Sequence, residues 1–232
     1  MMLPARTLLF IAFQALFAVG FWLAGSAEAW EASADWWPIS ATLANLACMA
    51  LLIGLFKGEG KRYQDIFRIQ RQSLKGDLLV MLGIVILFGP VGYLPGIFIA
   101  SWLYGDAQAP LDLFLRPLPM WAAVISLVIW PVTQGLAELP TYFGYSMPRL
   151  EGQTGRAWLA VALASGFLAI QHVALPLLFD GRFMTWRALM FLPFAFMVGI
   201  LLHWRPRLLP YLVIVHILID AATAAALLSV AY

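Results

Sequence analysis

The stretch PMWAAVISLVIWPVTQGLAELPTYFGYS, residues 119–146, decides the fold. It is long and apolar enough for a membrane-spanning helix, which needs about 20 mostly apolar residues. It nevertheless carries an acid, Glu138, in its second half. An ionisable side chain inside a bilayer costs roughly 2.5 kcal/mol or more unless it is paired or faces a water-filled cavity. The stretch therefore predicts a transmembrane helix that contains part of a functional site.

Composition extends this prediction to the whole chain. Hydrophobic residues make up 63% of the 232 residues and charged residues only 11%, against about 25% charged in a soluble domain. The few basic residues do not form a nucleic-acid footprint. Because lipid offers the backbone no hydrogen-bond partner and strand alternation is absent, the apolar stretches predict helices. We expect an all-α integral membrane bundle of seven transmembrane helices, near residues 7–25, 36–56, 78–103, 119–146, 157–178, 187–203 and 208–230.

No linker divides the chain, so we expect one membrane domain. Residues 1–118 hold the first three spans and a basic segment, 57–77, and residues 119–230 hold the remaining four. Apolar residues alternate with charges in 57–77, which is typical of an amphipathic surface segment; lipid contact and a solvated loop both fit. Cys48 lies in an apolar run and is expected to be a core residue.

The distribution of basic residues predicts the orientation. With the N-terminus in the cytoplasm, eleven of the fourteen Lys and Arg residues lie inside, and only Arg116, Arg182 and Arg187 lie outside. Arg6 is counted among the inside residues. This positive-inside bias predicts a cytoplasmic N-terminus and an external C-terminus, in a prokaryotic cytoplasmic membrane. Ala27-Glu28-Ala29 after the first span resembles a signal-peptide cleavage site, but a retained first helix is the favoured interpretation.

Four ionisable residues fall within predicted spans: Glu138 in the fourth, His172 in the fifth, and His216 and Asp220 in the seventh. His216 and Asp220 are four residues apart and therefore share one helical face. Since each is costly alone in lipid, we expect the four to form one site between spans four, five and seven. Within the fourth span, Pro140 removes a backbone hydrogen bond directly after this site.

Three sequence blocks carry these residues. The first runs from Glu138 to Gly144-Tyr-Ser-Met-Pro-Arg-Leu150, the second from Leu168 to His172, and the third from His216 to Asp220. In order and spacing they resemble the motifs of the CPBP family of intramembrane proteases, which includes type II CAAX prenyl proteases and bacteriocin-immunity proteins. Two motif residues differ: Leu139 stands where the family has a second glutamate, and Phe143 where it has an arginine. Leu168 replaces a phenylalanine, which is a milder change.

The resemblance implies a peptide hydrolase. Glu138, helped by His172, would deprotonate a water molecule, and His216 with Asp220 would stabilise the oxyanion. In the simplest arrangement Asp220 orients His216, which donates to the oxyanion. The implied partners are membrane lipid and a membrane-embedded or lipidated peptide substrate.

Other interpretations stay open. Two histidines and two carboxylates also suit zinc, although metal-independent water activation, with no cofactor, is favoured. If the missing glutamate and arginine matter for catalysis, the chain is a weakened relative that acts as a membrane scaffold or immunity protein. The four groups could also form the proton relay of a transporter.

The predicted span boundaries place the site residues at different depths in the membrane. Glu138 and His216 lie about eight residues from the cytoplasmic ends of their spans, and His172 about fifteen from its own, which is a mismatch of roughly 10 Å along the membrane normal. A shared site requires tilted helices or a longer fourth or fifth span.

Overall fold

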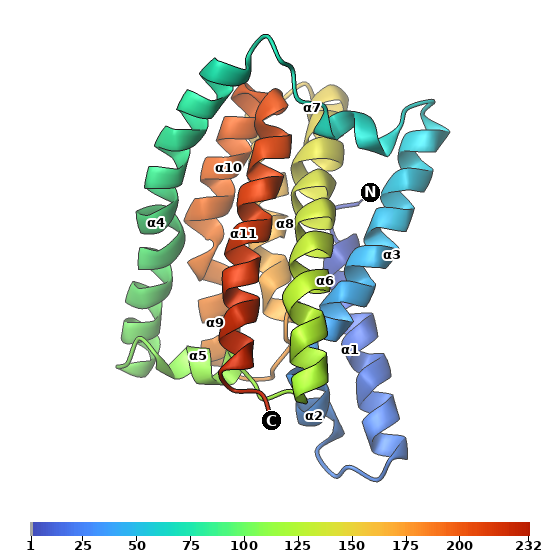
Figure 1. Ribbon diagram of the computed structural model, residues 1–232, viewed down its shortest axis with the longest axis vertical. Helices are drawn as coiled ribbons and strands as arrows, with labels where there is room; N and C mark the ends of the chain where they lie inside the picture. Colours follow the sequence, from blue (N-terminus) through green and yellow to red (C-terminus); the bar gives the residue numbers. More distant parts are fainter. Residues whose placement is uncertain (1) are drawn as a thin grey trace.

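The computed structural model describes residues 2–232, and within that range it contains helices and no strand (Figure 1). Seven helical segments are long and apolar enough to cross a membrane. They are Ala5–Leu23, Trp37–Gly58, Leu74–Tyr104, Met120–Thr154, Ala157–Ala174, Gly181–Trp204 and Pro206–Leu228. The predicted all-α, seven-span bundle is thus confirmed. The seven apolar helical segments are those of a multi-pass membrane protein.

Three spans are single helices, and the other four are composite. The single helices are α1 (Ala5–Leu23), α3 (Trp37–Gly58) and α4 (Leu74–Tyr104). The composite spans are α6 (Met120–Leu139) with η2 (Pro140–Ser146) and α7 (Met147–Thr154), α8 (Ala157–Gln171) with η3 (His172–Ala174), α9 (Gly181–Met190) with α10 (Leu192–Trp204), and η4 (Pro206–Leu208) with α11 (Leu209–Leu228). Short helices occupy three connections: α2 (Ala29–Asp35), η1 (Tyr63–Phe67) and α5 (Ala109–Phe114).

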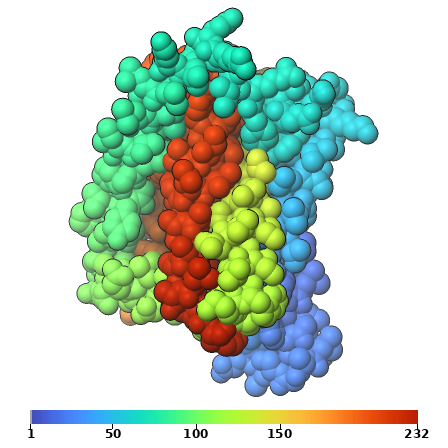
Figure 2. All heavy atoms as spheres, in the orientation of Figure 1, coloured from blue at the N-terminus to red at the C-terminus, as the bar shows by residue number. Residues whose placement is uncertain are grey.

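Helix α6 packs most extensively against α11 and α3, while α8 packs against α10. Helix α4 stands at one side of the bundle, against α9 and α10 (Figure 1). In the space-filling view a hollow separates α4 from α11 on one face of the molecule (Figure 2). The bundle is therefore open to its surroundings along one helix pair.

Pro140 starts a π-helical segment, η2, instead of ending the span. Because proline lacks an N–H, it interrupts the α-helical hydrogen bonds, and the wider turn restores them farther on. The fourth span thus continues to Thr154, and its predicted end at residue 146 was wrong. Glu138 now lies 16 residues before the end of its span, and His172 lies 15 residues after the start of the next. The predicted difference in depth between these two residues disappears.

Two arginines that were predicted to lie outside the lipid are buried. Arg6 is 1% exposed and Arg187 is 2% exposed, so neither is a loop residue. Both had been counted as orientation signals, and both are held by partners inside the protein. Two apolar clusters make up most of the core of the bundle. One includes Leu168 and Leu212, and the other includes Trp37 and Phe183.

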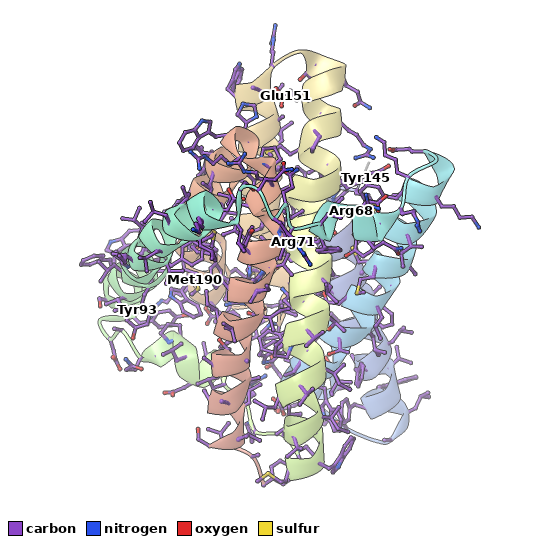
Figure 3. The ribbon with its side chains drawn as sticks, turned by 45° about the horizontal axis from the view of Figure 1, so that its top comes forward. Arg68, Arg71, Tyr93, Tyr145, Glu151 and Met190 are labelled. Carbon is purple, nitrogen blue, oxygen red and sulfur yellow. The ribbon has the colours of Figure 1, made fainter. Side chains whose placement is uncertain are left out.

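The amphipathic character predicted for 57–77 is visible in η1. Ile66 and Phe67 pack against the core, and the Tyr63 hydroxyl donates to the backbone carbonyl of Leu136 on α6. Arg68 and Arg71 lie on the outer side of this segment, where it crosses the bundle (Figure 3). The segment is therefore tied to the helix that carries Glu138.

Candidate functional site

Glu138 lies in the last turn of α6, directly before η2, and is 2% exposed. Its Oε2 atom accepts hydrogen bonds from Gln134 Nε2 at 2.6 Å and from Gln171 Nε2 at 2.5 Å. Gln134 is one turn earlier on α6, and Gln171 ends α8. The two amides fix one carboxylate oxygen between two helices and leave Oε1 free for other contacts.

Arg6, on α1, completes this arrangement. Its Nη2 lies 3.6 Å from Glu138 Oε2. The guanidinium also donates to Gln171 Oε1 at 2.8 Å, Asn45 Oδ1 at 2.8 Å and Gln134 Oε1 at 3.0 Å. Each amide that binds Glu138 thus also binds Arg6. A buried acid and its counter-charge share one hydrogen-bond network, which offsets the cost of placing either in lipid.

His172 follows α8 and presents one ring nitrogen to Glu138. Nδ1 lies 2.9 Å from the carbonyl of Leu168, and Nε2 lies 3.9 Å from Glu138 Oε2. The ring packs on Phe191 with centroids 4.1 Å apart. When Nδ1 carries the proton and donates to the carbonyl, Nε2 of the neutral ring keeps a lone pair directed at the carboxylate. The backbone contact therefore favours a proton-accepting Nε2.

His216 and Asp220 approach from α11. His216 Nε2 lies 3.5 Å from Glu138 Oε1 and 3.2 Å from Asp220 Oδ2. Both carboxylates thus face the same ring nitrogen, and Nδ1 of His216 has no hydrogen-bond partner among residues 2–232. Asp220 thus lies next to His216, as the sequence predicts, but its Oδ2 accepts no hydrogen bond from residues 2–232. The structure brings all four predicted residues together.

Close contact between α6 and α11 makes this convergence geometrically feasible. A Cβ atom at Gly135 would lie 2.5 Å from Ile217 Cγ1 and 3.2 Å from the carbonyl oxygen of Val213. Only glycine allows this spacing. Since Gly135 precedes Glu138 by three residues and Ile217 follows His216, the contact sets the distance between these two side chains.

A cavity of about 330 Å³ adjoins all four residues. Its other walls come from α4, α8, α10 and α11, with Phe191 between α9 and α10: Phe88, Gly89, Gly92, Tyr93, Leu168, Phe191, Phe194, Ile219 and Thr223. It lies along the hollow between α4 and α11 (Figure 2), and Tyr93 projects from α4 on this side of the bundle (Figure 3). The four ionisable side chains therefore line a cavity whose other walls are mostly apolar.

The donors do not form a zinc site. Among residues 2–232, no group of three or more His, Cys, Asp or Glu side chains is arranged to hold a metal ion. The Arg6 guanidinium lies beside the Glu138 carboxylate, and two amides already occupy Oε2. The positive charge of Arg6 would repel a cation bound at Glu138.

Leu139 and Phe143 lie in an apolar environment. Leu139 and Phe143 are 3% and 4% exposed and belong to the same apolar cluster as Leu168. They pack α6 and η2 against this cluster. The guanidinium near Glu138 comes from α1 instead.

Three further polar residues of the fourth span have partners of their own. Tyr142 donates to Gln171 Oε1 at 3.0 Å, while Thr141 lies 3.1 Å from the sulfur of buried Cys48, which is a core residue as expected. Tyr145 lies near the end of α3 (Figure 3) and donates to Glu59. Tyr142 therefore belongs to the network around Glu138, and Tyr145 does not.

Sequence reasoning missed the supporting residues Arg6, Asn45, Gln171 and Arg187. Asn45 interrupts an apolar span and Gln171 adjoins His172, so both carried a signal. Arg6 and Arg187 resembled ordinary residues near span ends. The domain division at residue 118 also assigned no site residue to the first three spans, whereas Arg6 and Asn45 belong to them.

The chain was compared with protein families, curated proteins and solved structures. No family model matches the chain, and neither a curated protein nor a solved structure matches it.

Proposed function

We propose that this protein is an intramembrane endopeptidase that uses Glu138 as the general base. The observation that carries this proposal is the convergence of one carboxylate and two imidazoles on a cavity with an apolar wall. Their order along the chain is the order found in the CPBP motifs, which this chain resembles.

In the proposed reaction a water molecule donates hydrogen bonds to Glu138 and to Nε2 of His172. Glu138 takes one proton while the water oxygen attacks the carbonyl carbon of the peptide bond. The C–O bond that forms turns the carbonyl oxygen into an oxyanion, which His216 stabilises as a hydrogen-bond donor. Glu138 then gives its proton to the leaving nitrogen, and the C–N bond breaks.

Arg6, Gln134 and Gln171 orient the base in this proposal. The family motif supplies a second glutamate and an arginine, and this chain has Leu139 and Phe143 in their places. Arg6 donates hydrogen bonds to both glutamines, and both glutamines donate to Oε2 of Glu138. The carboxylate is therefore not left without support, which favours catalysis over a purely structural role as a scaffold or immunity protein.

A substrate within the membrane fits the position of the cavity. The cavity borders α4 and α11 on the side where Figure 2 shows a hollow, and its wall there is mostly apolar. A membrane-embedded or lipidated peptide could reach Glu138 from this side. Without Arg6 and Arg187, the proposed orientation has ten basic residues inside and Arg116 and Arg182 outside, so a cytoplasmic N-terminus in a prokaryotic cytoplasmic membrane stays our proposal.

Peptide profiling of membranes tests the function. Membranes that contain the wild-type protein should accumulate cleavage products, and membranes with Glu138→Gln should not. Glu28→Gln, which changes an exposed acid outside the spans, is the matched control and should keep the products. Identical peptide profiles for the wild type and Glu138→Gln would refute the protease. Proton-driven flux in liposomes that Glu138→Gln abolishes would identify a transporter instead.

A further inference from the structure

Arg187 is a buried cation without a buried anion beside it. Its Nε donates to the carbonyl of His172 at 3.1 Å and its Nη2 to the carbonyl of Leu175 at 2.7 Å. The one polar contact of Nη1 among the described residues is the sulfur of Met190, at 3.8 Å, and Cζ lies 4.5 Å from the ring centroid of Phe114. No carboxylate of residues 2–232 lies within 4.0 Å of the guanidinium. Arg6, by contrast, has Glu138 at 3.6 Å.

A second unpaired donor lies in the same place. Trp130 is 3% exposed, and its indole Nε1 has no hydrogen-bond partner among the described residues. Trp130 and Arg187 line one cavity of about 250 Å³. Indole and guanidinium groups can only donate hydrogen bonds. This cavity therefore offers two buried donors at the Arg187 side, while Asp220, whose Oδ2 also has no hydrogen-bond partner among the described residues, lines the side shared with the first cavity.

This cavity adjoins the cavity of the proposed active site and shares part of its wall. Both cavities are bounded by His172, Phe191, Asp220 and Thr223. Apolar side chains form most of the remaining surface of the second cavity: Trp37, Leu111, Phe114, Leu115, Leu175, Trp186, Met190 and Ala226. A ligand there would be apolar and would carry one anionic group.

We propose that Arg187 and Trp130 form a subsite for a carboxylate of the peptide substrate. This inference rests on the proposed hydrolase and adds the class of peptide that it accepts. Arginine binds carboxylates strongly, with short charge-assisted hydrogen bonds. A carboxylate in this subsite would hold the peptide against His172, whose carbonyl Arg187 contacts. The carboxylate could belong to the C-terminus of the peptide or to an acidic side chain.

Hydrolysis of matched peptides tests the subsite. Full-length protein in lipid nanodiscs is given one apolar peptide in three forms: with a free C-terminal acid, with a C-terminal amide, and with an amide after a terminal glutamate. We expect the wild type to prefer an acid over the plain amide by at least tenfold in kcat/KM. Preference for the first form identifies the C-terminus as the source, and preference for the third identifies the side chain.

Variants separate binding from a structural role. Arg187→Gln should lower the preference for acid over amide to about onefold, and Trp130→Phe should lower it several-fold. Arg182→Gln, an exposed arginine on the same helix, should retain it. If Arg187→Gln lowered kcat/KM equally for acid and amide, Arg187 would only support the backbone of His172, and the subsite would be refuted.

A binding assay keeps this inference separate from the proposed reaction. The Glu138→Gln protein should bind the acid more tightly than the amide by at least tenfold, and Glu138→Gln/Arg187→Gln should bind both equally. If the wild type hydrolysed none of the three peptides while Glu138→Gln still bound the acid more tightly, the subsite would stand and only the hydrolase would be refuted. Equal binding of acid and amide by Glu138→Gln would refute the subsite.

Discussion

At the scale of single residues, the environment of Glu138 decides what the site can do. Oε2 is held by two glutamine amides, whereas Oε1 faces His216. The carboxylate is thus fixed through one oxygen and available through the other. Because Arg6 contacts both glutamines, its guanidinium stabilises the charge and the geometry together.

Replacement of Arg6 by methionine should destabilise the protein strongly. Removal of one partner from a buried ion pair leaves an uncompensated charge and typically costs about 3–5 kcal/mol. The double variant Arg6→Met/Glu138→Gln should recover part of this loss, because no buried charge is left alone. Thermal unfolding of the single and double variants in detergent measures both effects. Equal stability of wild type and Arg6→Met would show that the pair contributes nothing.

At the scale of helices, the contact between α6 and α11 sets the position of His216. Gly135→Ala should force the helices apart, because its Cβ would meet Ile217 Cγ1 at 2.5 Å. We expect a loss of about 1–3 kcal/mol in stability, as for other overpacked sites, and a clear fall in hydrolysis. Gly166→Ala on α8, where a Cβ meets nothing within 4 Å, is the control and should be neutral or slightly stabilising. Full activity of Gly135→Ala would contradict the proposed spacing.

The end of α3 is tied to α7 by an ion pair outside the lipid-spanning segment of α3. Arg149 donates to both carboxylate oxygens of Glu59 and lies over the ring of Tyr145, with Cζ 3.5 Å from its centroid. It is thus an internal tie between helices. His203 Nδ1, on α10, lies 3.3 Å from a carboxylate oxygen of Glu151 on α7.

The tie between Glu59 and Arg149 should depend on pH. The hydrogen bond from Arg149 lowers the pKa of the Glu59 carboxyl below its usual value. Because the folded pKa is the lower one, the tie stabilises the protein above the ordinary carboxyl pKa and is lost as the pH falls through the lowered value. Glu59→Gln should therefore unfold at a lower temperature than the wild type at pH 7, with the difference shrinking in acid. A difference that grows in acid would contradict this assignment.

At the scale of the whole molecule, the opening between α4 and α11 should be the route to the site. Gly89 on α4 lines the cavity, and a Cβ there would meet nothing within 4 Å. Gly89→Trp should therefore fold normally, fill the opening and lower hydrolysis at least tenfold. Gly83→Trp places the same side chain on α4 away from the cavity walls and should retain activity. If both variants hydrolysed peptide at the wild-type rate, the substrate would enter elsewhere.

The sequence was sufficient to predict the seven spans and the proximity of Glu138, His172, His216 and Asp220. Hydropathy is a local property, so each span was predicted within a few residues except where helices are composite, as at Pro140. The four ionisable residues were visible because a charge is rare within an apolar span.

Only the tertiary structure decided which residues support the site. Arg6 and Gln134 are 128 positions apart and nevertheless share a hydrogen bond. Arg6 and Arg187 lie near the ends of apolar runs, where a basic residue normally reaches water, and their burial depends on how distant helices pack. Local composition determines which segments enter the membrane, whereas the environment of a buried charge depends on neighbours that only the folded chain supplies.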